Sequence, residues 1–223
     1  MTVTLESLKT ARYFARLEAA ALADISQFVF EKHFPAGEVV LWEGGNDRVV
    51  YFVITGLVKL FATSAEGREF IIRIAYGGEP INDDNLFSKG PNLVSAATLS
   101  PVVLYGLDQA ALDRILRTYP PVVSSIAEAL AARQRYMVRL ATDLVFKSVT
   151  SRLARLLLER EQLAHTGGDN LKVTQQDMAF MIGTVRELVS RSLRELEAAG
   201  AISLKHNQII ISNRNRLVEL SEQ

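Results

Sequence analysis

The chain carries the stretch TQQDMAFMIGTVRELVSRSLREL at residues 174–196, and this stretch decides the predicted fold. Ala179 is small enough to let two helices cross closely. Gly183, four residues later, suits a tight turn because glycine tolerates a positive φ. Val189, six residues beyond the glycine, places an apolar side chain where the corner between two helices must be filled. Small, glycine and β-branched residues at this spacing predict a helix-turn-helix.

Polar residues on both helices of this motif suit contacts with DNA. Thr174 and Asp177 resemble a capping box, which predicts a helix N-terminus whose amides can face a phosphate. The second helix places arginine, glutamate and serine near one face, where arginine suits guanine and glutamate suits cytosine. The alternative is a solvated helix with internal pairs such as Arg191–Glu195. The predicted DNA-contacting residues are Thr174, Gln175, Thr184, Arg186, Glu187, Ser190, Arg191, Arg194 and Lys205.

A β-hairpin is predicted directly after the second helix. Gly200 suits the C-terminal cap of that helix, and residues 201–204 and 208–211 have the pattern of two short strands. Lys205 and His206 lie in the connection between them. They either contact DNA phosphate or belong to an ordinary surface turn. The hairpin completes a predicted winged helix-turn-helix.

The first part of the chain has the pattern of an all-β domain. Segments rich in β-branched and aromatic residues alternate with glycine-containing turns, as in barrels and jelly rolls, and a helical segment at 5–25 precedes them. The predicted strands cover residues 28–34, 38–42, 49–54, 57–62, 69–76, 94–99 and 102–107. We assign their aromatic residues to the core rather than to a ligand cage, namely Phe52, Phe61, Phe70 and Tyr76.

A long helix is predicted from about Pro120, since proline is tolerated in a first helical turn. Apolar residues then repeat at alternating spacings of three and four, which favours a seam between two copies of the chain over packing within one domain. Arg133 interrupts the pattern, and its side chain either snorkels, pairs with a partner carboxylate or reaches a ligand. The seam residues are Val123, Ile126, Leu130, Met137, Leu140 and Leu144.

These segments predict an α+β protein with three parts. The parts are a β-roll with its helical lead-in at 1–107, helices that include a dimerisation helix at 108–144, and the winged helix-turn-helix at 145–223. The 25 basic and 25 acidic residues balance, which neither supports nor excludes DNA because phosphate contacts are local. We expect a cytoplasmic protein without a membrane span, because no leader-like or long apolar run is present.

Enzymatic chemistry is not expected. The chain has no cysteine, which excludes disulfides, cysteine-ligated zinc and iron–sulfur clusters. Its three histidines, His33, His165 and His206, lie in three different regions, and no catalytic triad, metal-ligand spacing or phosphate loop is found. The acidic doublet Asp83-Asp84 suits the cap of a turn better than acid–base work. We therefore predict no catalytic residue, no metal and no cofactor.

The sequence RELVSR at residues 186–191 resembles the recognition-helix motif Arg-Glu-x-Val-Ser-Arg of the CRP/FNR superfamily, the cyclic-AMP receptor protein and fumarate–nitrate reductase regulators. Residues 34–38, 54–60 and 78–79 resemble its sensor, and residues 143–152 resemble its hinge. The resemblance implies a cyclic-nucleotide-binding-like β-roll, a homodimer, and double-stranded DNA with a palindrome of TGA-like half-sites. It also implies RNA polymerase as a partner. We expect an activator, although the direction of regulation depends on where the site lies.

The sensor departs from the family's cyclic-nucleotide cassette, Gly-Glu-x-x-Gly-Glu-x-x-Leu-Phe followed by Arg-Ser-Ala. Val94 stands where the resemblance implies an arginine for the cyclic phosphate, and Asn82-Asp83 replaces the second Gly-Glu. Met137 and Val138 stand where, according to the resemblance, the nucleotide sensors of the family present hydroxyl groups to the base of the cyclic nucleotide. We therefore predict that cyclic AMP and cyclic GMP are not ligands. The candidate effector pocket consists of Glu79, Asp83, Val94, Ser95, Arg133 and Met137.

Two alternatives remain open. The chain is either active without a ligand or a sensor whose DNA binding needs haem or another small molecule that reaches Arg133. Haem needs an axial ligand, and we interpret His33, the histidine of the sensor part, as a surface residue. A winged helix that contacts proteins is a further possibility, but it would not need the arginines of the second helix.

Overall fold

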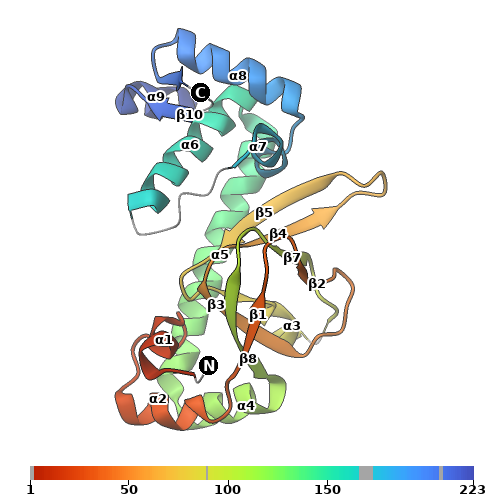
Figure 1. The fold of residues 1–223 in the computed structure, drawn as a ribbon, viewed down its shortest axis with the longest axis vertical. Helices are drawn as coiled ribbons and strands as arrows, with labels where there is room; N and C mark the ends of the chain where they lie inside the picture. Colours follow the sequence, from red (N-terminus) through yellow and green to blue (C-terminus); the bar gives the residue numbers. More distant parts are fainter. Residues whose placement is uncertain (1–2, 89, 166–172, 206–207) are drawn as a thin grey trace. The chain divides into compact units, whose positions relative to one another are not determined.

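The computed structural model describes residues 3–88, 90–165, 173–205 and 208–223. The chain forms two compact units. The first unit contains residues Met1–Ala62 and Ile72–Gln134, and the second contains Thr63–Ile71 and Arg135–Gln223. Figure 1 shows strands and short helices in the first unit and mainly helices in the second. None of the helices in the described part of the chain is long and apolar enough to cross a bilayer.

Two four-stranded sheets make up the predicted β-roll, in the orders β1-β8-β3-β6 and β2-β7-β4-β5 (Figure 1). The strands are β1 (Phe30–Phe34), β2 (Val39–Leu41), β3 (Val49–Thr55), β4 (Val58–Thr63), β5 (Glu69–Ala75), β6 (Pro80–Ile81), β7 (Ser95–Thr98) and β8 (Val102–Asp108). β3 and β8 pair antiparallel from Val49 opposite Asp108 to Thr55 opposite Val103. All seven predicted strands are confirmed, whereas β6 is too short to have a sequence pattern of its own.

The helical segment before the strands is broken into two helices. These are α1 (Leu5–Thr10) and α2 (Ala19–Ser26), rather than one helix over residues 5–25. The break exists because Tyr13 and Phe14 turn inward against Phe52, with ring centroids 5.3 and 5.2 Å from that of Phe52. The amide of Arg12 donates to the carbonyl of Gly78, which anchors the same turn to the strands. Packing against the roll therefore overrides local helix propensity here.

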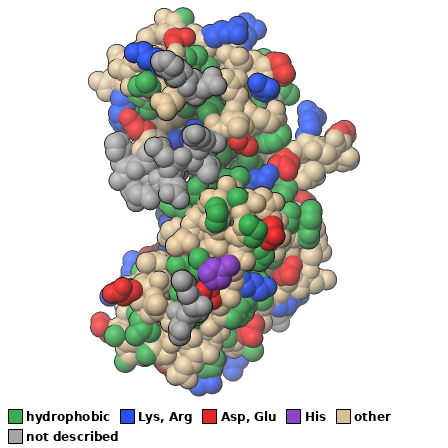
Figure 2. Space-filling model, viewed as in Figure 1, with side chains coloured by type: hydrophobic (Ala, Val, Ile, Leu, Met, Phe, Trp, Pro, Cys, Tyr) green, Lys and Arg blue, Asp and Glu red, His purple; other side chains and the backbone are tan. Residues whose placement is uncertain are grey.

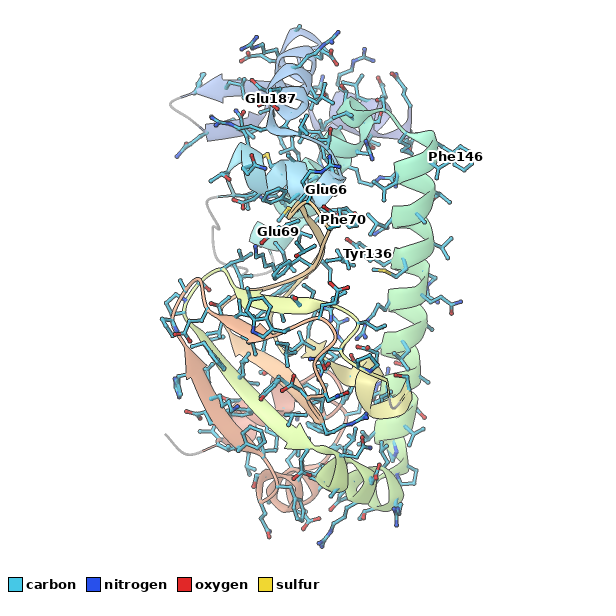
Figure 3. The ribbon with its side chains drawn as sticks, turned by 90° about the vertical axis from the view of Figure 1, so that its right-hand side faces the viewer. Glu66, Glu69, Phe70, Tyr136, Phe146 and Glu187 are labelled. Atoms are coloured by element: carbon cyan, nitrogen blue, oxygen red, sulfur yellow. The ribbon has the colours of Figure 1, made fainter. Side chains whose placement is uncertain are left out.

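Helices α3 (Asp83–Ser88), α4 (Gln109–Thr118) and α5 (Pro120–Phe146) complete the first unit and lead into the second. The predicted start of the long helix at Pro120 is confirmed. Ile126 is buried in the core of the first unit, so it packs within its own chain. Other apolar side chains of α5 remain exposed, and Figure 3 shows Phe146 projecting from the end of the helix. They are Val123, Leu130, Val138, Leu144, Val145 and Phe146.

The second unit is built around the predicted helix-turn-helix. Its further elements are α6 (Val149–His165), α7 (Gln175–Ile182), α8 (Arg186–Ala198), β9 (Ile202–Lys205), β10 (Gln208–Ile211) and α9 (Arg214–Glu222). Ala179 and Val189 are fully buried where α7 meets α8, and Gly183 between them has φ +65°. The steric prediction for the corner is therefore confirmed. Helix α9 was not predicted.

The left-handed backbone at Gly183 predicts how substitutions there change the free energy of unfolding. A β-branched residue is strained at this φ, whereas asparagine tolerates it. A Cβ at this position would also lie 2.8 Å from Cδ2 of Leu144, a flexible side-chain end that can shift in both variants. We expect Gly183→Val to lower the free energy of unfolding by about 1–2 kcal/mol more than Gly183→Asn does. Urea unfolding followed by circular dichroism measures this difference, and equal losses would contradict it.

Candidate nucleic-acid interface and effector pocket

The N-terminus of α7 has the predicted capping box. The backbone amide of Asp177 donates to Oγ1 of Thr174 at 3.1 Å, and the amide of Thr174 donates to Oδ2 of Asp177 at 2.9 Å. The first helix of the motif therefore begins where the sequence predicts. Thr174 is exposed, and Gln175 and Thr184 are half-buried.

Helix α8 presents a polar face to solvent and an apolar face to the core. Its buried residues are Val189, Ser192, Leu193 and Leu196. The opposite side carries the predicted base-reading residues, and Figure 3 marks Glu187 among them. Arg186, Glu187, Arg191 and Arg194 are exposed, and Ser190 is half-buried. The structure thus brings the predicted residues of α8 together on one surface.

Arg191 also pairs with Glu195 within α8, as expected for the alternative of a solvated helix. Its Nε donates to Oε1 of Glu195 at 3.3 Å, one helical turn away. The pair does not bury the arginine, whose side chain is 77% exposed. Within the described residues, neither Arg186 nor Arg194 forms an ion pair. On the face shown in Figure 2, cationic and acidic side chains are interspersed over the part that contains α8.

The predicted wing is present as the antiparallel pair β9–β10, with Gln208 opposite Lys205 and Ile211 opposite Ile202. Lys205 is exposed at the end of β9. His206, which the sequence places in the same connection, lies outside the described residues. The amide of Leu204 donates to Oε1 of Glu197 at 2.8 Å, which fixes the first strand to α8.

The unpredicted helix α9 ends against the junction of α5 and α6. Nζ of Lys147 donates to the carbonyl of Ser221 at 2.5 Å, and Nη1 of Arg155 contacts Oδ2 of Asp143 at 2.5 Å. Cations favour the C-terminus of a helix, where carbonyls lack partners. Lys147 and Asp143 belong to the stretch that resembles the family hinge, and their partners lie outside it. They hold the end of α5 to the helix-turn-helix domain.

The candidate effector pocket contains a buried charge network. Asp83 has no exposed surface, and Nη1 and Nη2 of Arg133 donate to its two oxygens at 2.7 and 3.0 Å. The hydroxyl of Tyr13 donates to Oδ2 of the same carboxylate. Burial raises the pKa of Tyr13 far above its ordinary value, and the charge of Asp83 adds to this, so the hydroxyl keeps its proton. Arg133 therefore pairs with a carboxylate of its own chain.

Glu79 forms a second pair beside the first. Its carboxylate accepts from Arg73 at 3.1 Å and from Arg12 at 3.0 Å, and Arg73 also donates to the carbonyl of Pro80 at 2.6 Å. Burial lowers the pKa of Arg73, and the nearby charge of Arg133 lowers it further. Tyr13 and Arg73 are not among the residues predicted from the sequence. The available signal for Arg73 was a charge among the apolar residues 70–75 of β5.

The other predicted pocket residues have structural partners of their own. Val94 packs against a group of buried core residues that includes Val53 and Leu104. Oγ of Ser95 accepts from the amide of Glu43 at 3.0 Å. Met137 is half-buried and belongs to the second compact unit. His33 is exposed and lies 2.5 Å from Glu31, in accord with its interpretation as a surface residue. Among the described residues, no group of three or more histidine and acidic side chains is arranged to hold a metal ion.

Asp83 makes the stability of the fold depend on pH. Burial raises the pKa of its carboxyl, but the hydrogen bonds and the charge of Arg133 lower it more, so the folded pKa lies below the ordinary value. The ionised group therefore stabilises the fold above about pH 4, and this contribution is lost as the pH falls through the folded pKa. We expect Asp83→Asn to lower the free energy of unfolding at neutral pH by about 3 kcal/mol.

The same substitution should also flatten the loss of stability on acidification from about pH 6 to about pH 3, because the variant has one carboxylate fewer to protonate. Urea unfolding across this pH range measures both effects. Glu219→Gln, which removes an exposed carboxylate paired with Arg216 at 2.7 Å, is the control. A slope for Asp83→Asn equal to that of the wild type would contradict the assignment of the pKa.

Comparisons with known proteins agree with this architecture. Residues 31–119 match the cyclic nucleotide-binding domain, and residues 151–220 match the Crp-like helix-turn-helix domain. A CRP-like cAMP-activated global transcriptional regulator of Mycobacterium tuberculosis is 30% identical over 217 residues, which cover 95% of this chain and 97% of the relative. The chain belongs to the CRP/FNR family of transcription regulators. It is a DNA-binding regulator, and the prediction that it is not an enzyme is confirmed by these relatives.

Solved structures show the same fold. The c-di-GMP responsive regulator CLP of Xanthomonas campestris superposes with a TM-score of 0.74 at 24% identity, covering 87% of this chain and 99% of that one. A CooA mutant from Carboxydothermus hydrogenoformans superposes with a TM-score of 0.75 at 17% identity, covering 99% and 97%. The predicted α+β architecture, with a β-roll, a long helix and a winged helix-turn-helix, is therefore confirmed.

Proposed function

We propose that this regulator is a cytoplasmic homodimer that binds a palindromic DNA site with TGA-like half-sites and does not require cyclic AMP. The observation that carries the proposal is the exposed face of α8, which presents Arg186, Glu187, Arg191 and Arg194 beyond the Gly183 corner. A second helix at such a corner is the element that enters the major groove in helix-turn-helix proteins. We propose RNA polymerase as the protein partner and activation of transcription as the outcome. The proposed domain limits are residues 107 and 144.

The exposed apolar residues of α5 support the dimer. Of the predicted seam residues, Val123 is 48% exposed, and Leu130 and Leu144 are each 37% exposed. Apolar side chains at such spacing are buried when two helices pair. A two-fold dimer would place two α8 helices about one DNA turn apart, as a palindromic site requires. The other predicted DNA-contacting residues are proposed phosphate contacts at the edge of this surface, namely Thr174, Gln175, Thr184 and Lys205.

The charge network around Asp83 supports independence from cyclic AMP. Both oxygens of its carboxylate are already bound by Arg133 and Tyr13, so a ribose hydroxyl would have to displace an internal partner. Val94, which is packed against the core, offers nothing to a cyclic phosphate. Some relatives are named for cAMP and one for c-di-GMP, so effectors differ within the family.

An effector-dependent sensor is the second candidate. Arg73 and Arg133 lie near enough for the charge of one to lower the pKa of the other. A small anion that displaces Glu79 or Asp83 would supply the counter-charge of these arginines in its place. DNA binding that appears only after extracts of small molecules are added would favour this candidate over a ligand-free regulator.

DNA selection without any effector tests the proposed function. We expect the purified full chain to retain genomic fragments that share a palindrome with TGA-like half-sites at near-physiological salt, because dimer geometry and the α8 face are intrinsic to the chain. Calorimetry with cyclic AMP and cyclic GMP should show no tight, saturable binding. Tight binding of either nucleotide would overturn the proposed independence, and retention of no sequence above background would contradict ligand-free DNA binding.

Arg191→Ala tests base reading by α8. Bidentate contacts from arginine to guanine are worth about 1–3 kcal/mol of discrimination against the wrong base. We therefore expect the variant to lose about tenfold or more of its preference for the selected site, with a smaller loss of affinity for unrelated DNA. Fluorescence anisotropy with both duplexes at several salt concentrations measures the two effects. An equal loss on both duplexes would assign Arg191 to a phosphate instead.

A further inference from the structure

Glu195, which the sequence analysis did not include among the DNA-contacting residues, joins two elements of the helix-turn-helix domain. Its Oε1 accepts from Nε of Arg191 on α8 at 3.3 Å. Its Oε2 lies 2.6 Å from the hydroxyl oxygen of Thr150 on α6. Glu195 thus links the guanidinium of Arg191 to a helix outside the recognition helix.

The hydroxyl of Thr150 is itself held in place. It lies 2.9 Å from Oγ of Ser192, which is buried between α6 and α8. A threonine hydroxyl has one proton to donate, and a carboxylate is a stronger acceptor than a serine hydroxyl. Thr150 therefore donates to Glu195 and accepts from Ser192. The carboxylate of Glu195 is thus linked through Thr150 to a buried serine, while half of its side chain stays exposed.

Glu195 accepts a hydrogen bond from Nε of Arg191, and the two terminal nitrogens of the guanidinium remain available for a base. A guanidinium is a planar fork, and a bond to Nε leaves both terminal nitrogens free. Those two nitrogens can form the bidentate contact with O6 and N7 of guanine. The side chain is 77% exposed, so both nitrogens are open to a ligand. The bond to Glu195 restricts the plane of the fork before DNA arrives.

We propose that Glu195, anchored by Thr150, is a positioning residue that presents Arg191 to a guanine and so sets sequence discrimination. The proposal rests on the proposed DNA-binding function. Its benefit is preorganisation, because a restricted side chain loses less conformational freedom on binding. A fixed carboxylate also repels phosphate, which disfavours contacts between Arg191 and the DNA backbone. Arg186 and Arg194, which lack such a partner among the described residues, are not restricted in this way.

Substitution of Glu195 and of Thr150 tests the proposal in the full chain. The test compares two duplexes, the selected site and a site changed at the one base pair for which Arg191→Ala loses its preference. We expect Glu195→Ala to reduce the preference for the selected site about fivefold to tenfold. Affinity for unrelated DNA should stay equal or rise, because a repulsive charge is removed. Thr150→Val should act in the same direction with a smaller effect. Glu219→Ala, which breaks another exposed arginine–glutamate pair on α9, should change neither quantity.

A double-mutant cycle separates positioning from a structural role. In the Arg191→Ala background, Glu195→Ala should have no further effect on discrimination, because the residue that it positions is absent. An exposed pair one helical turn apart contributes little to stability, so thermal unfolding should be nearly unchanged in Glu195→Ala. Thr150→Val also removes the acceptor of the buried Ser192 hydroxyl, so a lower unfolding temperature is expected for that variant alone.

Three results would overturn the proposal. They are an unchanged preference in Glu195→Ala, an equal loss of affinity for all duplexes, and a loss of preference that persists without Arg191. If the wild type itself prefers no sequence, the proposed function fails together with this inference. If the wild type is selective and the variant is equally selective, this inference alone fails.

Discussion

The buried carboxylate of Asp83 is the constraint on which the first unit depends most. An ionised group without exposed surface is stable only when it is both paired and hydrogen-bonded. Arg133 supplies the counter-charge from α5, and Tyr13 supplies a hydroxyl from the turn between α1 and α2. One side chain therefore holds the N-terminal segment, the start of α3 and the long helix together. Removal of either partner would leave a charge in a medium that solvates it poorly.

This arrangement changes what the sensor can recognise. In a pocket that binds a polar ligand, charged side chains face the ligand, whereas here Asp83 and Glu79 face arginines of their own chain. Val94 packs against the apolar core of the roll and adds no charge to this network, in which the charges already have partners within the chain. In the proposed ligand-free regulator, the roll serves as a stable support from which α5 emerges.

The helix-turn-helix shows how closely stability and recognition are connected. Ala179, Gly183 and Val189 set the angle between α7 and α8, and this angle turns the polar face of α8 outward. The same helix carries Ser192 toward the core and Glu195 at the edge, so that α6 can support a side chain on the reading face. In the proposed mode of DNA recognition, the packed interior of the domain supports the recognising side chain, as precise binding sites generally require.

Sequence alone determined the elements whose causes are local. The corner around Gly183, the cap at Thr174, the strands of the roll and the start of the long helix at Pro120 each depend on residues a few positions apart, and periodicity reveals them. Tertiary structure alone decided the break in the N-terminal helix, the packing of α9 and the partners of buried or positioned charges. Tyr13 and Asp83 are 70 residues apart and Thr150 and Glu195 are 45 apart. No spacing rule links such pairs, because they meet only after the packing of apolar surfaces has brought their helices and strands together.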